Sequence, residues 1–171
     1  MATYRKADDL AGLVSAVMKK WHKKLKDAGV TVSVLYAHAP RDKETGEPTG
    51  PALKLHGSIC AAVIKINSHK ARVAGMTDAE ITVDGDRWND WTEAQHQALI
   101  DHELEHLELV IGEDGEVKLD DCHRPKLKTR PHDHEIGVFE SVAQRHGANS
   151  FEAKQYKPLH HFFSQQTFPW G

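Results

Sequence analysis

The stretch "TEAQHQALIDHELEHLELV", residues 92 to 110, decides the fold because it predicts one amphipathic helix in the middle of the chain. Thr92 is a favourable N-cap, and Glu93 puts a carboxylate in the first turn, where the helix dipole stabilises negative charge. Apolar residues recur at helical spacing on one side of the segment: Ala94, Ala98, Leu99, Leu104 and Leu107. We expect the helix to end between Val110 and Gly112.

Two histidines stand four residues apart on this predicted helix, with a glutamate directly after the first. His102 and His106 therefore share one face, about one turn apart, and their rings can reach one metal ion. Glu103 lies about 100° further round the helix, so it can miss the metal and still act as general base toward a metal-activated water. Zinc suits two imidazoles, one further protein ligand and an open fourth position. The competing interpretation is a charged, solvated helix that matches the pattern by chance.

A third ligand must come from later in the chain. A metzincin would have glycine and histidine where this chain has Leu109 and Gly112, so that arrangement is excluded. His132 is the best placed candidate, because it opens a predicted second helix that can pack on the first. His134 and Glu135 are the alternatives. More remote candidates are His123, Glu140 and His146.

Other polar residues are candidates for supporting roles. Carboxylates beside the histidines could orient the metal ligands, although an exposed surface carboxylate is the alternative for each. These carboxylates are Asp101, Asp133 and Glu135. The residues considered for stabilising an oxyanion are His123, Arg124, Tyr156 and His160.

The whole chain predicts an α+β protein. The pattern favours an N-terminal helix, a small and mostly antiparallel sheet, the central helix, a hairpin and a C-terminal helix that brings the third ligand. Residues 1 to 150 are expected to form a single domain, and residues 151 to 171 an aromatic C-terminal extension. The predicted elements are a helix over 8–28, strands over 30–39, 59–67 and 81–83, a hairpin over 111–119 and a helix over 132–146.

Composition limits the classes of protein to which this chain can belong. The chain has 171 residues and a formal net charge of -3, so it does not demand nucleic acid or an anionic membrane as partner. Cys60 and Cys122 form no disulfide framework, which favours a reducing environment. We see no signal peptide or membrane-spanning stretch and expect a cytoplasmic protein. The 13 histidines raise the prior for metal binding.

Three motifs within residues 79 to 147 follow the order and separation of a known family. They are "AEITVDGDRWNDWTEAQHQALIDHELEHLEL", "EDGEVKL" and "RPHDHEIGVFESVAQRHG". Together they resemble the "Putative phage metallopeptidase" family, and residues 30 to 67 resemble it more loosely. The resemblance implies a minimal zincin-like fold, similar to the SprT-like metalloproteases.

The resemblance also implies roles for individual residues. His102 and His106 match the first two metal ligands, Glu103 the catalytic glutamate, and His132 of "RPHD" the third ligand. It implies a zinc-dependent metallopeptidase, with one zinc ion per chain, that hydrolyses a peptide bond in a protein or peptide. A phage origin would place this enzyme in the host cell cytoplasm.

The substrate of such an enzyme is expected to pair as an added strand along the sheet edge beside the central helix. We expect Ile81, Thr82 and Val83 to form that edge, because they immediately precede the helix.

A different class of function is a non-catalytic module in which zinc stabilises the fold and the protein binds a partner. Such a site needs a fourth protein ligand, for example Cys122, His123 or His134. This module could be associated with DNA, because the segments 19–26 and 123–131 are basic. The slightly acidic chain does not favour nucleic acid, and a solvated helix face explains the lysines. The sequence predicts no oligomeric state.

Overall fold

The computed structural model describes residues 1–133 and 139–152, which form an α+β fold. A four-stranded sheet has the order β1 (Thr3–Lys6), β2 (Val32–His38), β6 (Ala79–Asp84) and β5 (Ala62–Ile66). β2 and β6 run parallel, whereas β1 pairs with β2 and β5 pairs with β6 in antiparallel fashion. The predicted small, mostly antiparallel sheet is therefore confirmed.

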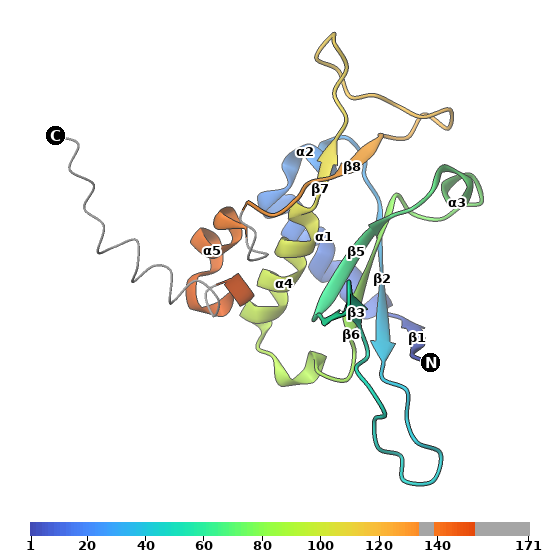
Figure 1. The fold of residues 1–171 in the computed structure, drawn as a ribbon. Coiled ribbons are helices and arrows are strands. Elements are labelled where there is room, and N and C mark those ends of the chain that lie inside the picture. Colours follow the sequence, from blue (N-terminus) through green and yellow to red (C-terminus); the bar gives the residue numbers. More distant parts are fainter. Residues whose placement is uncertain (134–138, 153–171) are drawn as a thin grey trace, which may run out of the picture.

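The described chain has five α-helices besides this sheet. They are α1 (Ala11–Trp21), α2 (Lys23–Asp27), α3 (His69–Val73), α4 (Glu93–Glu105) and α5 (Glu140–His146). Figure 1 shows α1, α4 and α5 gathered on the same side of the strands. Within the described ranges, no helix is long and apolar enough to cross a membrane.

The helix predicted over residues 8 to 28 is interrupted. A 3-10 turn (Asp8–Leu10) precedes α1, and His22 separates α1 from α2 with a non-helical backbone, φ -114 and ψ 48. The His22 side chain is buried, and its Nε2 lies 2.6 Å from Oδ1 of Asp101 in α4. The break places an imidazole inside the molecule, where a continuous amphipathic helix was expected.

α4 begins where the sequence predicts. The Thr92 hydroxyl accepts a hydrogen bond from the Gln95 N–H, and the Gln95 side-chain oxygen accepts one from the Thr92 N–H. This reciprocal capping box satisfies two backbone donors that the first turn leaves unpaired. The buried apolar residues of the helix are Ala98, Leu99, Ile100 and Leu104.

α4 ends earlier than the predicted end between Val110 and Gly112. Glu105 is its last residue, and His106 is the C-cap. After this cap, buried and exposed residues alternate, as is typical of a strand. Both leucines of β7 (Leu107–Leu109) are buried, and Glu108 between them is exposed. β7 pairs with β8 (Leu127–Thr129), and this small ribbon replaces the last part of the predicted helix.

The core lies where α4 packs on the central strands. Ile81 and Val83 of β6 and Ile100 and Leu104 of α4 are all 0% exposed. Burying a side chain of this size contributes about 1.5–3 kcal/mol relative to exposure. These contacts fix the helix that carries both predicted metal ligands against the sheet.

β6 lies inside the sheet, so the expectation that Ile81, Thr82 and Val83 form a free edge is wrong. β2 pairs with β6 on one side and β5 pairs with it on the other. All three residues are buried, a continuous pattern that is typical of a central strand rather than an edge. On this side of the sheet the unpaired edge belongs to β5.

The hydrogen bonds of the β5–β6 ladder show which backbone groups face that edge. The Asn67 N–H donates to Asp78 O at one end, and the Asp84 N–H donates to Ala61 O at the other. Bonded and non-bonded positions alternate in an antiparallel pair. The N–H and C=O of Ile64, midway between them, therefore point away from β6 and toward the open edge.

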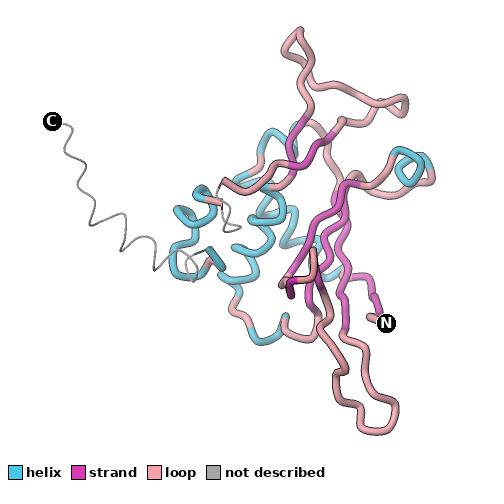
Figure 2. Tube along the Cα trace, viewed as in Figure 1, coloured by secondary structure: helices cyan, strands magenta, loops and turns pink. Residues whose placement is uncertain are grey.

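Several smaller elements were not predicted from the sequence. They are β1, α3, β8 and the two-stranded pair β3 (Lys54–Leu55) and β4 (Ser58–Ile59). The predicted hairpin over 111–119 is present as a bridge between Ile111 and Val117. α5 begins at Glu140 rather than at residue 132. Long irregular segments extend beyond the strands (Figure 2), and residues 153–171 of the predicted extension lie outside the described chain.

A buried ion cluster holds one end of the sheet. Asp78 is 1% exposed, and its Oδ1 lies 2.8 Å from Nη2 of Arg72 and 2.8 Å from Nη2 of Arg124. Its Oδ2 accepts hydrogen bonds from the N–H and the hydroxyl of Thr31, both at 2.8 Å. One carboxylate thus joins α3, β6, the segment before β2 and the irregular segment before β8.

We predict that Asp78→Ala lowers the free energy of unfolding by about 3–5 kcal/mol, because it removes a buried carboxylate that pairs with both Arg72 and Arg124 and accepts two hydrogen bonds from Thr31. Glu108→Ala is the matched control, since Glu108 pairs with Lys128 at 3.2 Å while both side chains are about half exposed. That loss should stay below about 1 kcal/mol. Urea denaturation measures both, and equal losses would contradict the prediction.

Candidate metal centre

Three histidine side chains converge at the C-terminal end of α4. His102 lies in the helix, His106 caps it, and His132 follows β8. One ligand nitrogen from each lies within 4.8 Å of the others, and Nε2 of His132 is 3.2 Å from Nε2 of His102. No other group of His, Cys, Asp or Glu in the described ranges is arranged to hold a metal ion.

The remaining candidates for the third ligand do not join this cluster in the described chain. His146 Nε2 instead lies 2.8 Å from Asp101, and Glu140 accepts a hydrogen bond from the Gln144 amide. His123 occupies an exposed turn with φ 59. The alternatives His134 and Glu135 lie outside the described residues.

The outer nitrogens of two imidazoles are held by acceptors. Nδ1 of His106 donates to the carbonyl of Arg130 at 2.8 Å, and Nδ1 of His102 donates to the carboxylate of Glu152. Each ring therefore keeps its proton on Nδ1 and an unshared electron pair on Nε2. Electron pairs that face one another repel unless a cation lies between them, so the donor set fits a metal ion.

Phe139 forms an apolar wall of the site. It is 0% exposed, and its ring centroid lies 5.0 Å from that of His102, 4.7 Å from His106 and 4.9 Å from His132. The Arg130 guanidinium lies 4.8 Å from the same ring centroid. Phe139 excludes water and limits the rotation of all three imidazoles. Phe139 directly follows Val138 in the sequence, and the sequence pattern alone did not assign it a role in the site.

Burial sets the charge of the histidines. It lowers the pKa of His106 to about 4, outweighing the hydrogen bond to Arg130, and the neighbouring histidines lower it further. The pKa of His132 is also lowered, first by burial and then by the charge of His102. Burial lowers the pKa of His102 as well, but Glu152 and other carboxylates outweigh it and raise the value. Neutral imidazoles are the form that binds metal.

Glu103 lies behind the histidines, against the sheet. It is 4% exposed, and burial raises its pKa to about 7, although the charge of His102 and a backbone hydrogen bond from Ile64 act in the opposite direction. That N–H is one of those that point toward the open edge of β5. A carboxyl group with this pKa can both accept and release a proton near neutral pH.

Asp101, a candidate for orienting a metal ligand or for an exposed surface carboxylate, has neither position in the structure. Its fully buried carboxylate contacts Nε2 of His22 at 2.6 Å, Nε and Nη2 of Arg145 at 2.8 and 3.0 Å, and Nε2 of His146 at 2.8 Å. Burial alone would raise the pKa of Asp101, but His22 and Arg145 outweigh burial and lower it. The carboxylate binds α4 to α5 and to the break between α1 and α2.

Asp133 and Arg124 also have structural partners. Asp133 pairs with Nη2 of Arg130 at 2.5 Å and accepts the Glu140 N–H at 3.0 Å, so it fixes the segment on both sides of residues 134–138. Arg124, considered for oxyanion stabilisation, donates to Met76 O and pairs with Asp78 in the buried ion cluster. Two other oxyanion candidates, Tyr156 and His160, lie outside the described residues.

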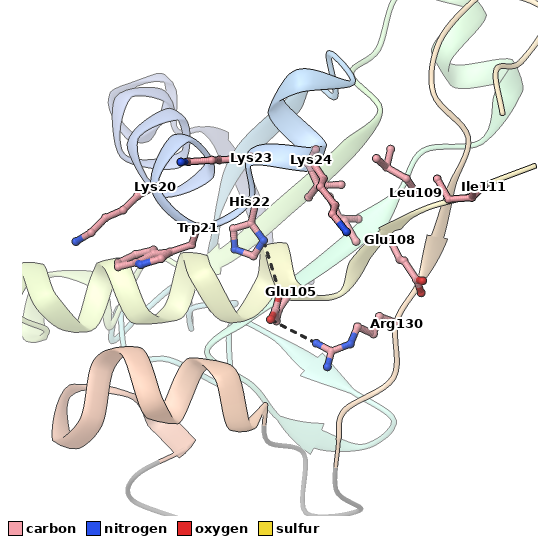
Figure 3. A pocket seen from close by; sticks show the side chains of 12 residues that line it. Lys20, Trp21, His22, Lys23, Lys24, Glu105, Glu108, Leu109, Ile111 and Arg130 are labelled. Atoms are coloured by element: carbon pink, nitrogen blue, oxygen red, sulfur yellow. Dashed lines mark ion pairs between the residues drawn. The ribbon is translucent and has the colours of Figure 1, made fainter. Parts of the chain in front are cut away.

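A pocket of about 600 Å³ opens beside the end of α4, but none of the three histidines lines it (Figure 3). Glu105 lies within it, 3.6 Å from Nδ1 of His22 and 3.5 Å from Nη1 of Arg130. Lysines at the α1–α2 break and leucines of β7 complete its walls. The convergence of the imidazoles, rather than this cavity, therefore defines the candidate metal centre.

We predict that metal-free wild type loses stability relative to Glu103→Gln as the pH rises from 4.5 to about 7. Below this window Glu103 is protonated in both states; within it the unfolded chain releases the proton while the folded chain retains it. This difference in the pKa of Glu103 between the unfolded and folded chain corresponds to on the order of 3 kcal/mol of stability. Denaturation in a chelator at several pH values measures the difference, with exposed Glu108→Gln as control. A flat difference would contradict this assignment.

Comparison with known proteins agrees with this geometry. The family model described as "Putative phage metallopeptidase" matches residues 2–161, which includes all three histidines and Glu103. No curated protein and no solved structure matches the chain. The likeness to SprT-like metalloproteases therefore stays a prediction. Because the family model covers nearly the whole sequence, the chain belongs to the "Putative phage metallopeptidase" family.

Proposed function

We propose that this chain is a zinc-dependent peptidase whose metal is held by His102, His106 and His132, one ion per chain. One observation carries the proposal: three imidazole nitrogens converge beside a buried glutamate that can exchange a proton near neutral pH. Three histidines without a fourth protein ligand are typical of a catalytic zinc site, which keeps one position open. The family description supports the same class of activity.

Each residue has a defined task in this proposal. When bound, zinc would activate a water molecule and polarise the carbonyl of the scissile peptide bond. Glu103 accepts the proton of the attacking water at its carboxylate and donates it to the nitrogen of the leaving amine. Its raised pKa suits both transfers, because neither protonation state is strongly favoured near pH 7.

We place the substrate along β5 rather than along Ile81 to Val83. β5 is the edge strand of the sheet, and the Ile64 N–H that faces the edge also hydrogen-bonds Glu103. An extended peptide could pair as an added strand with backbone groups of β5 other than the Ile64 N–H, which Glu103 occupies. Its backbone would then lie next to the proposed general base. A protein or peptide substrate inside the host cell remains the expected target.

The alternative, a zinc-stabilised module without catalysis, is not favoured. It requires a fourth ligand, and the described residues supply none. Cys122 and His123 are exposed residues of the irregular segment before β8. No feature of the site favours DNA as a partner over a peptide.

Glu103→Gln tests the catalytic role. General-base catalysis contributes about 10² to 10⁴ in rate, so we expect the variant to lose at least about 100-fold in peptide cleavage while it binds as much zinc as wild type. Cleavage of a peptide mixture from a digested bacterial proteome can be followed by mass spectrometry. Exposed Glu108→Gln should retain wild-type activity. Full activity of Glu103→Gln would reject the proposed base.

His132→Ala tests the third ligand. We expect about one zinc per chain in wild type, a loss of most of that zinc in His132→Ala, and retention in His134→Ala. Elemental analysis of protein purified from zinc-supplemented medium measures all three. Loss in His134→Ala alone would move the third ligand to that residue. Absence of zinc from the wild type would remove the basis for a metallopeptidase.

A further inference from the structure

Glu152 is buried in a way that its protein partners do not explain. It is 1% exposed and follows the 3-10 turn (Gly147–Asn149) after α5. Its Oε1 accepts the hydrogen bond from Nδ1 of His102, whereas its Oε2 is buried and has no hydrogen-bond partner in the described chain. The family resemblance did not indicate this residue, and a single carboxylate in "SFEAK" carries no sequence signal.

Two other buried carboxylate oxygens also lack a hydrogen bond, but both face an arginine. Oδ1 of Asp78 and Oδ2 of Asp120 lie 2.8 and 3.2 Å from Nη2 of Arg72. In the described chain, His102 is the one basic side chain paired with Glu152. Glu103 adds a nearby carboxylate rather than a compensating charge. Of these three buried carboxylates, Glu152 is therefore the one that does not pair with an arginine in the described chain.

Leaving a buried carboxylate without a compensating charge is costly, on the order of several kcal/mol. His102 cannot supply that charge while it binds a metal, because its Nε2 must keep the electron pair. A divalent ion on Nε2 would supply it across the ring, since the imidazole transmits charge between a metal and a carboxylate on its other nitrogen. The same hydrogen bond fixes which nitrogen carries the proton.

We propose that Glu152 is a positioning residue built for the occupied metal centre: it aims Nε2 of His102 at the ion, and the ion compensates its buried charge. This inference rests on the proposed metal site. α5, which precedes Glu152, is held to α4 by Arg145 and His146 on Asp101. The carboxylate is thus delivered to His102 by a segment that the protein has already fixed.

The proposal predicts that Glu152→Gln weakens zinc binding without destabilising the metal-free chain. Glutamine can still accept the His102 hydrogen bond, but it carries no charge to match a metal ion. Zinc binding should therefore weaken roughly 10-fold to 100-fold. The metal-free chain should keep its unfolding temperature, because glutamine fills the same volume and keeps the hydrogen bond to His102. If Glu152 only supported the fold, the substitution would also lower the stability of the metal-free chain.

Zinc affinity is measured for the full chain by competition with a chromogenic chelator. Thermal unfolding of the chelator-stripped chain is followed for all variants in the same buffer. Ser150→Ala is the matched control, because Ser150 is also 1% exposed and its hydroxyl donates to Gly147 O within the same turn. We expect this variant to unfold at a lower temperature and to bind zinc within about twofold of wild type.

Unchanged zinc affinity in Glu152→Gln would overturn the inference, and so would an unfolding temperature lowered as much as in Ser150→Ala. This test of Glu152 can be distinguished from the test of peptidase activity. If wild type binds zinc but cleaves no peptide, the peptidase proposal fails while the affinities still decide the role of Glu152. If wild type binds no zinc, both proposals fall. Weaker zinc binding without loss of metal-free stability is the result expected for Glu152→Gln.

Discussion

The buried carboxylate of Asp101 is the interaction on which the rest of the arrangement depends. Burying a charge is costly unless partners compensate it, and His22, Arg145 and His146 together supply those partners for Asp101. Meeting that demand requires the break between α1 and α2 and fixes α5 on α4. The position of α5 in turn sets the residues at either end of it, the apolar wall and the carboxylate behind the first metal ligand.

Three consecutive side chains of α4 serve three different parts of the molecule. Successive residues point about 100° apart on a helix. Asp101 therefore reaches the neighbouring helices, His102 the candidate metal centre, and Glu103 the edge strand β5. The rigidity of one helix converts a sequence triplet into fixed directions. This explains how two acids only two residues apart can differ so much: paired donors lower the pKa of Asp101, and burial raises the pKa of Glu103.

The sequence predicted what local periodicity determines. The start of α4, the shared face of His102 and His106, and the approximate strands follow from caps and spacing within a few residues. It failed where distant segments decide. The end of α4 depends on pairing with β8, and the edge of the sheet depends on the order of strands. Glu152 and Phe139 are single residues whose importance comes only from where α5 packs, so no pattern in the chain marks them.

The backbone of Arg130 meets His106 in both directions: its N–H donates to His106 O at 2.8 Å, and its carbonyl accepts the proton of the His106 ring, across a separation of 24 residues. These two hydrogen bonds close the loop of residues 107–129 before any metal binds. An ion arriving at His102 and His106 would meet His132 at high effective concentration and would not have to supply the entropy of loop closure. This loop can consequently change in length through evolution, growing or shrinking at its tip, while the ligand geometry stays the same.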